Sequence, residues 1–156
     1  MEHDEIRKTY HSQDITSGAV RTGYYAKAKS YPGPVCISRS NKGGFPEIPE
    51  LAPSYHILSR YKYIDHDEKA YAESYAAQLD RIEWDAVCAK AGDIIRQSGA
   101  ITLLCFEKPG DFCHRHAAAQ RLCAELVRRN IISEDRICGP EEKEPEEKDE
   151  QLSLFD

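Results

Sequence analysis

The stretch Ile101-Thr-Leu-Leu-Cys-Phe-Glu-Lys-Pro-Gly-Asp-Phe-Cys-His-Arg-His116 decides the fold of this chain. Its first six residues are largely apolar and rich in β-forming types, which predicts a buried strand over 101–106. A Pro-Gly turn follows, and a helical pattern of apolar residues then runs over about 112–129. A strand, a loop and a helix in this order form the unit with which α/β proteins build sites at the carboxyl ends of their strands. We therefore expect a site in this loop.

Strands and helices alternate along the rest of the chain. Residues 1–15 show no periodic pattern, and the glycines and prolines between 41 and 53 predict a long loop. The remaining elements expected from apolar periodicity and capping residues are strands over 19–25, 35–38 and 136–138, and helices over 54–61 capped by Ser54, over 68–79, and over 86–97 between Asp85 and Gly99. This order predicts a three-layer α/β sandwich with a mostly parallel, Rossmann-like sheet.

The charge of the chain is concentrated near its end. The whole sequence carries a net charge of −6, and residues 141–156 hold eight acidic and two basic side chains. The preceding residues therefore balance at 19 charges of each sign, which argues against strong non-specific binding to nucleic acid. The composition predicts three parts, namely an α/β domain over 1–139, a disordered acidic linker over 140–150 and a terminal apolar peptide over 151–156.

Two further features concern the cellular compartment. The sequence has neither a run of about 18 apolar residues, as a membrane span needs, nor an apolar segment near Met1, as a secretion signal needs. The six cysteines form no Cys-x-x-Cys pair, and several fall inside expected strands or helices. We expect a cytoplasmic, reduced protein with no membrane partner and no disulfide framework.

The loop after residue 106 carries the candidate catalytic groups, Glu107, Cys113 and His114. Asp111 is expected to cap the following helix, whose amide groups and dipole would favour an anion held by Arg115. The same field would lower the pKa of Cys113. Glu107 would act as a base or hold a ribose hydroxyl. For Cys113 a nucleophile and a small buried residue are both open, and Arg115 could instead pair with Glu107.

A metal ion is not expected in this loop. Cys113, His114 and His116 are suitable ligand types. Adjacent Cys113 and His114 on a helix would not both reach one ion easily, and no second cluster offers partners. We therefore predict no metal and no cofactor.

A basic and aromatic segment precedes this unit. No acidic residue occurs between Asp14 and Glu47, and the segment interleaves lysines and arginines with tyrosines. Cations that contact phosphate and aromatic rings that stack on bases are typical of single-stranded nucleic-acid or nucleotide sites. The residues expected to bind phosphate or nucleic acid here are Arg39, Lys42, Tyr24 and Tyr25. A solvated charged surface with packed tyrosine rings is the open alternative.

The motif Leu104-Cys-Phe-Glu-Lys-Pro-Gly-Asp-Phe-Cys-His-Arg115 resembles the signature of domain-of-unknown-function family 488. The segments 22–27, 35–39 and 51–54 are similar to that family's pattern as well, so the resemblance covers about residues 18–130. Many members read Asp-Val-Arg where this chain has Ile37-Ser-Arg39, so an acidic role is absent at that point while Arg39 is kept. The resemblance implies an α/β domain with a shared polar pocket and names no reaction.

The terminal peptide carries a second resemblance. Gln151-Leu152-Ser153-Leu154-Phe155 is similar to the short peptide with which bacterial replication and repair proteins dock on the β sliding clamp. That likeness implies that Leu154 and Phe155 fill an apolar pocket of the clamp, while the Gln151 amide hydrogen-bonds at its edge. Leu152 is the remaining residue expected to bind the partner. A flexible tether would raise the local concentration after docking. An accidental apolar terminus is the open alternative.

These observations predict a bacterial α/β protein that acts on or binds nucleic acid or nucleotides and is recruited to DNA by its tail. Arg39 and Arg115 would hold phosphate, and Glu107 and His114 would share proton transfer. Two other classes are open: a non-enzymatic clamp-binding adaptor or regulator, and a small-molecule enzyme unrelated to DNA. Whether the domain is an enzyme at all is left open by the sequence.

Overall fold

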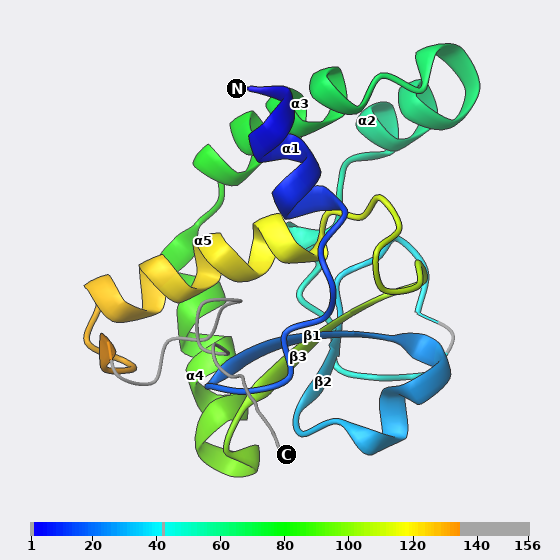
Figure 1. The fold of residues 1–156 in the computed structure, drawn as a ribbon. Coiled ribbons are helices and arrows are strands. Elements are labelled where there is room, and N and C mark those ends of the chain that lie inside the picture. The colour runs from blue at the N-terminus through cyan, green and yellow to red at the C-terminus, as the bar shows by residue number, and fades with distance from the viewer. Residues whose placement is uncertain (1, 42, 135–156) are drawn as a thin grey trace, which may run out of the picture.

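The structure is a computed structural model that describes residues 2–41 and 43–134 (Figure 1). Eleven elements follow one another in these residues: α1 (His3–Tyr10), β1 (Val20–Tyr24), η1 (Tyr25–Ser30), β2 (Pro34–Cys36), η2 (Pro49–Leu51), α2 (Tyr55–Arg60), η3 (Tyr61–Asp65), α3 (Glu68–Asp80), α4 (Trp84–Ser98), β3 (Ile101–Cys105) and α5 (Arg115–Arg128).

The three strands form one parallel sheet in the order β1-β3-β2. Leu103 of the central strand lies in register with Thr22 on one side and with Val35 on the other. All five residues of β3 are buried, because a central strand of a parallel sheet is covered on both faces. The short, continuous apolar run in the sequence reflects this double burial.

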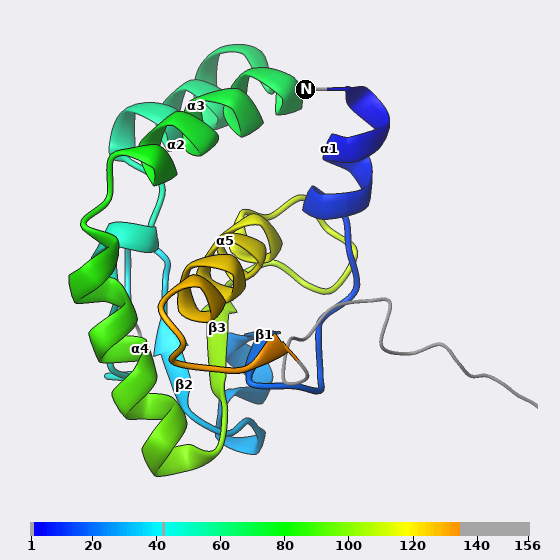
Figure 2. The same cartoon turned by 90° about the vertical axis from the view of Figure 1, so that its left-hand side faces the viewer.

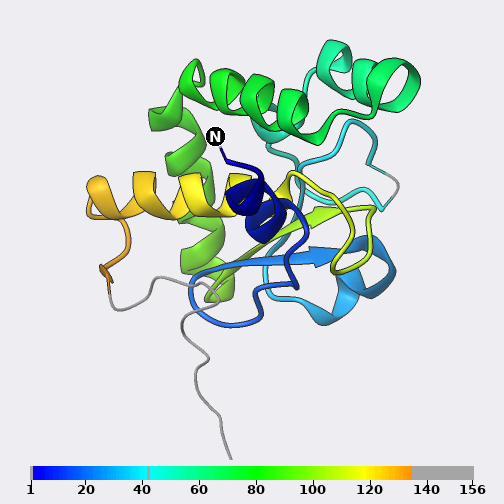
Figure 3. The ribbon, with the colours of Figure 1, turned by 45° about the horizontal axis from the view of Figure 1, so that its top comes forward.

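The two faces of the sheet are covered by different parts of the chain. Thr22 and Gly23 point to opposite faces, since successive residues of a strand alternate. Thr22 Oγ1 lies 3.4 Å from Nδ1 of His116, so this face is covered by α5. On the other face, the ring of Tyr31 packs directly against Gly23. The predicted α/β sandwich with a parallel sheet is therefore confirmed, with η1 and the residues after it as the third layer (Figure 3).

The helical layer is built around α5. Both α4 and α5 contact β3 and each other, and α1 packs against α3 and α5 (Figure 2). The core between these helices and the sheet contains apolar side chains from every long helix and from the α5-facing side of the strands. The carboxyl ends of β2 and β3 lie beside the segment formed by α2 and η3.

Most predicted elements are present, with two corrections. Residues 1–15 lack a periodic pattern in the sequence, yet α1 forms there because Ile6 and Tyr10, one helical turn apart, are buried in the core. Asp85 does not cap α4, whose N-cap is Glu83; the Asp85 carboxylate instead accepts a hydrogen bond from Arg129 at 2.9 Å. Ser54 caps α2 as predicted, by accepting from the Ile57 amide.

Three predictions fall outside the described residues: the strand over 136–138, the acidic linker over 140–150 and the peptide over 151–156. Within residues 2–41 and 43–134, none of the helices combines the length and apolarity that a membrane crossing requires.

Candidate functional site

A cavity of about 180 Å³ lies at the carboxyl ends of β2 and β3. β3 reaches it through Cys105, and the loop after β2 contributes Ser38 and Arg39. On the opposite side, α2 and η3 contribute an apolar and basic wall that includes Tyr61 and Lys62. The cavity therefore occupies the position at which open α/β sheets commonly bind ligands.

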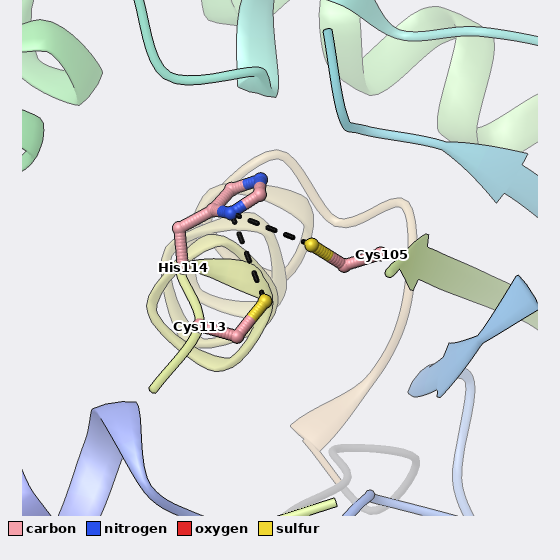
Figure 4. Close-up of side chains that lie close together, drawn as sticks. All are labelled: Cys105, Cys113 and His114. Carbon is pink, nitrogen blue, oxygen red and sulfur yellow. Dashed lines mark hydrogen bonds between the residues drawn. The ribbon is translucent and has the colours of Figure 1, made fainter. Parts of the chain in front are cut away.

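Three side chains with metal-binding and nucleophilic character converge at one end of this cavity. The Nδ1 atom of His114 lies 3.8 Å from the sulfur of Cys105 and 3.8 Å from the sulfur of Cys113 (Figure 4). All three side chains are buried, and their ligand atoms lie within 4.8 Å of one another. The sequence predicted Cys113 and His114 as site residues but missed Cys105, although Cys105 stands two residues before Glu107 at the end of the strand.

The orientation of the His114 ring is fixed by a hydrogen bond to the backbone. Its Nε2 atom lies 2.6 Å from the carbonyl oxygen of Ile37, which can only accept, so Nε2 carries a proton. In the neutral ring, the lone pair of Nδ1 then faces the two sulfurs. Burial alone would lower the pKa of His114, but the adjacent Cys113 and the hydrogen bond to Ile37 raise it above its usual value.

The start of α5 explains why adjacent Cys113 and His114 can converge. The helix begins at Arg115 with His114 as its N-cap, so Cys113 precedes the helix. The Cys113 amide donates to the carbonyl of Tyr10 at 2.9 Å, which ties this turn to the end of α1. One predicted cap is wrong, because Asp111 does not cap α5. The predicted helix start at about residue 112 is also too early, so Cys113 does not lie on a regular helix.

Glu107 completes the reactive end of the cavity. The Cys105 thiol donates to its Oε1 atom at 2.8 Å. Burial alone would raise the pKa of Glu107, but hydrogen bonds from the Cys105 and Cys113 thiols lower it, so the carboxylate is ionised at neutral pH. The pKa of Cys113 is raised well above its usual value by burial and by Cys105. This is the opposite of the predicted direction, because the sequence did not indicate that Cys113 is enclosed beside a second thiol.

Arg115 is placed differently from its predicted role at a phosphate. Its side chain is fully buried, and its Nε donates to Asp14 at 2.8 Å, on the face of the sheet that α5 covers. It is absent from the residues that line the cavity. Its two Nη atoms and Nε2 of His116 have no hydrogen-bond partner among the described residues. Burial and the neighbouring Arg115 lower the pKa of His116 to about 4.

The predicted phosphate-binding and stacking residues are divided between two places. Arg39 lines the cavity, where its Nη1 lies 3.5 Å from the carbonyl of Pro53. Tyr25 packs on Phe106, another lining residue, with ring centroids 4.6 Å apart. Tyr24 instead faces Lys27, whose Nζ lies 6.0 Å from the ring centroid. Lys42 falls outside the described residues.

Aromatic rings from distant segments form the apolar wall of the cavity. Phe112 stacks on Tyr61 with centroids 4.9 Å apart, and the ring of Tyr71 meets Phe112 edge-on at 5.0 Å. Phe106 also lines the cavity and is 41% exposed, so it is available to a ligand. Sequence reasoning missed Tyr61 and Lys62 as site residues, since only the tertiary fold brings η3 over the strand ends.

Comparison with known proteins identifies the family. The model of the family described as the active DUF488-N3 subclade matches residues 34–126, a span that includes β2, β3 and every residue named above as lining the cavity. No curated protein and no solved structure shows a significant match to the chain. Because the match covers more than half of the sequence, the chain belongs to the DUF488 family.

Proposed function

We propose that this DUF488 protein is an enzyme that acts on a nucleotide, either free or as a unit of nucleic acid, bound in the cavity at the ends of β2 and β3. The observation that carries the proposal is that a single cavity contains both reactive side chains and two basic side chains. Glu107 and His114 lie at the reactive end, while Arg39 and Lys62 supply positive charge. Such a combination suits a substrate with a phosphate beside the bond that reacts.

The size and lining of the cavity favour a single ring of the nucleotide. A cavity of about 150 Å³ suffices for a benzene ring, and this one measures about 180 Å³. It is smaller than the roughly 300–1,000 Å³ of sites that enclose whole drug-sized ligands. A base or a pentose would therefore enter it against Tyr61, Phe106 and Phe112, while the remainder of the nucleotide stays outside.

The reactive groups support proton transfer. Glu107 is ionised at neutral pH, so we assign it the role of proton acceptor. His114, with its raised pKa, is the partner that returns a proton. Cys113 remains protonated in its buried setting, so the free thiol is not the proposed nucleophile. The word "active" in the description of the matching subclade agrees with an enzymatic role.

Calorimetric titration of the full chain with nucleoside monophosphates tests the proposal. We expect Arg39→Ala to weaken binding by about 10- to 100-fold, since hydrogen bonds to charged groups contribute about 1.5–3 kcal/mol. Arg96→Ala is the matched control, because Arg96 is exposed on α4 and pairs with Asp93. Equal affinities of the wild type and both variants would contradict the assignment of the cavity.

Recruitment to DNA through the terminal peptide is the second part of the proposal. The net charge of residues 1–140 is zero, so the domain needs another source of affinity for DNA. Docking of Gln151, Leu152, Leu154 and Phe155 on a bacterial β sliding clamp would supply it. The acidic residues between the domain and this peptide would repel one another and hold the peptide away from the domain.

The test compares the full chain with a variant that carries Leu154→Ala and Phe155→Ala. Surface plasmon resonance on immobilised clamp should show binding of the wild type only. Binding of both proteins, or of neither, would contradict docking on the clamp through Leu154 and Phe155. A clamp-binding protein whose cavity accepts no nucleotide would instead fit the adaptor alternative.

A further inference from the structure

We propose that Cys105, Cys113 and His114 form a binding site for a divalent metal ion of the zinc class. The site lies within the cavity of the proposed function and would add a cofactor to it, with His114 then serving as a ligand in place of its role in proton transfer. Metal binding by these three residues does not depend on the proposed substrate, so the two proposals fail separately.

The distances between the ligand atoms suit one tetrahedral ion. Zinc binds sulfur at about 2.3 Å and imidazole nitrogen at about 2.0–2.1 Å, which places the ligand atoms of one tetrahedral site about 3.5–3.8 Å apart. Both sulfur-to-Nδ1 distances are 3.8 Å, and all three ligand atoms fall within 4.8 Å (Figure 4). The two sulfur-to-nitrogen distances are thus already close to the spacing of ligands around one tetrahedral ion.

The surroundings of the cluster are those of a metal site. A histidine ligand usually donates its other ring N–H to a carbonyl or carboxylate, which fixes the ring. His114 does so through Nε2 to the Ile37 carbonyl, and Nδ1 is left as the ligand atom. Each cysteine is 3% exposed, as is His114, yet all three line the cavity, so an ion can reach them.

The charges also balance. Binding of a divalent ion replaces one proton on each thiol, and the two thiolates neutralise the ion. The ion and its three protein ligands together therefore carry no net charge, which removes the main cost of burying them, and the ionised Glu107 lies outside this set. Soft sulfur ligands with one imidazole favour zinc over magnesium or calcium, which prefer oxygen.

Three protein ligands would leave one position of a tetrahedral ion open, and all three of these residues line the cavity. Catalytic zinc sites have this open arrangement, with water in the fourth position. The carboxylate of Glu107 lines the same cavity, with Oε1 2.8 Å from the Cys105 sulfur. A water held there would present its proton to Glu107, and this last step rests on the proposed function.

The test is a titration of metal-free, reduced full chain with Co²⁺, followed by displacement with Zn²⁺. We expect one Co²⁺ per chain, with the thiolate-to-cobalt charge-transfer absorption and the intense visible bands of a tetrahedral ion. Cys105→Ser and Cys113→Ser should each reduce the affinity for Co²⁺ by at least about 100-fold. Loss of a residue that only orients a metal ligand costs about 10- to 100-fold, so loss of a ligand itself should cost at least as much. Cys88→Ser is the matched control, because Cys88 is a buried cysteine of α4 outside the cluster.

The wild type alone keeps the proposal falsifiable if a variant fails to fold. Absence of a charge-transfer band at one equivalent, with the cysteines confirmed to be reduced, would overturn it. An equal loss in the Cys88→Ser control would overturn it as well. If either result is found and the metal-free protein still binds a nucleotide, the metal site is rejected and the proposed function is retained.

Discussion

Replacement of Asp14 by asparagine should destabilise the fold strongly, because Asp14 neutralises a fully buried cation. The Arg115 side chain is 0% exposed and that of Asp14 is 9% exposed, with 2.8 Å between Nε and Oδ1. The substitution keeps the size of the side chain and removes its charge. Breaking a buried pair by removing one partner costs about 3–5 kcal/mol, since the other charge stays buried without compensation. Asp14 also accepts from Thr22 Oγ1 at 3.0 Å, which adds to the expected loss.

Urea unfolding followed by circular dichroism measures this effect. With a slope of about 1–3 kcal/mol per molar urea, Asp14→Asn should lower the midpoint by at least about 1 M. Asp93→Asn, which removes an exposed ion pair with Arg96, should cost under about 1 kcal/mol. Adding Arg115→Met to Asp14→Asn should restore much of the stability, because the orphaned charge is then gone. A loss in Asp14→Asn no larger than that in Asp93→Asn would refute the reasoning.

Three further outcomes are expected. Glu107→Gln should lower turnover of a nucleotide substrate by about 100- to 10,000-fold while its binding, measured by calorimetry, is retained. Although burial opposes it, hydrogen bonds from three arginines lower the pKa of Glu125 from 4.5 to about 2. Its stabilisation is therefore present above pH 4.5 and lost as the pH falls towards 2, so the unfolding free energies of the wild type and Glu125→Gln should converge in acid. Gly33→Ala should lower the free energy of unfolding, measured in thermal melts, by about 1–3 kcal/mol more than Gly44→Ala. Both glycines have a positive φ, so the backbone strain is shared. Of the two, only Gly33 lies where an added Cβ would meet the backbone, 2.2 Å from the carbonyl oxygen of Ala100.

The strands and the long helices were predictable because their signals are local. The run over 101–105 is apolar since β3 is buried on both faces, and Gly99 ends α4 in a left-handed conformation. The helix α1 was missed because only Ile6 and Tyr10 are buried in an otherwise polar segment. Its stability depends on contacts with α3 and α5, which no local pattern reveals.

The site was predictable in position but not in detail. Strand alternation places Cys105 on the same face as Leu103, towards α5, but its meeting with His114 depends on where the helix begins. A predicted start a few residues too early placed Cys113 inside the helix and Arg115 towards the cavity. The actual partner of Arg115 is Asp14, and a pairing across 101 positions has no signature in a single sequence.

The most direct test of the central claim is a nuclear magnetic resonance titration of the isotope-labelled full chain with a deoxynucleoside monophosphate. Changes in amide chemical shift should be concentrated on the cavity segments, around residues 38–40, 61–62 and 105–114, and Arg39→Ala should weaken them. Shifts that are absent, or that gather on surfaces away from the ends of β2 and β3, would contradict a nucleotide site in this cavity.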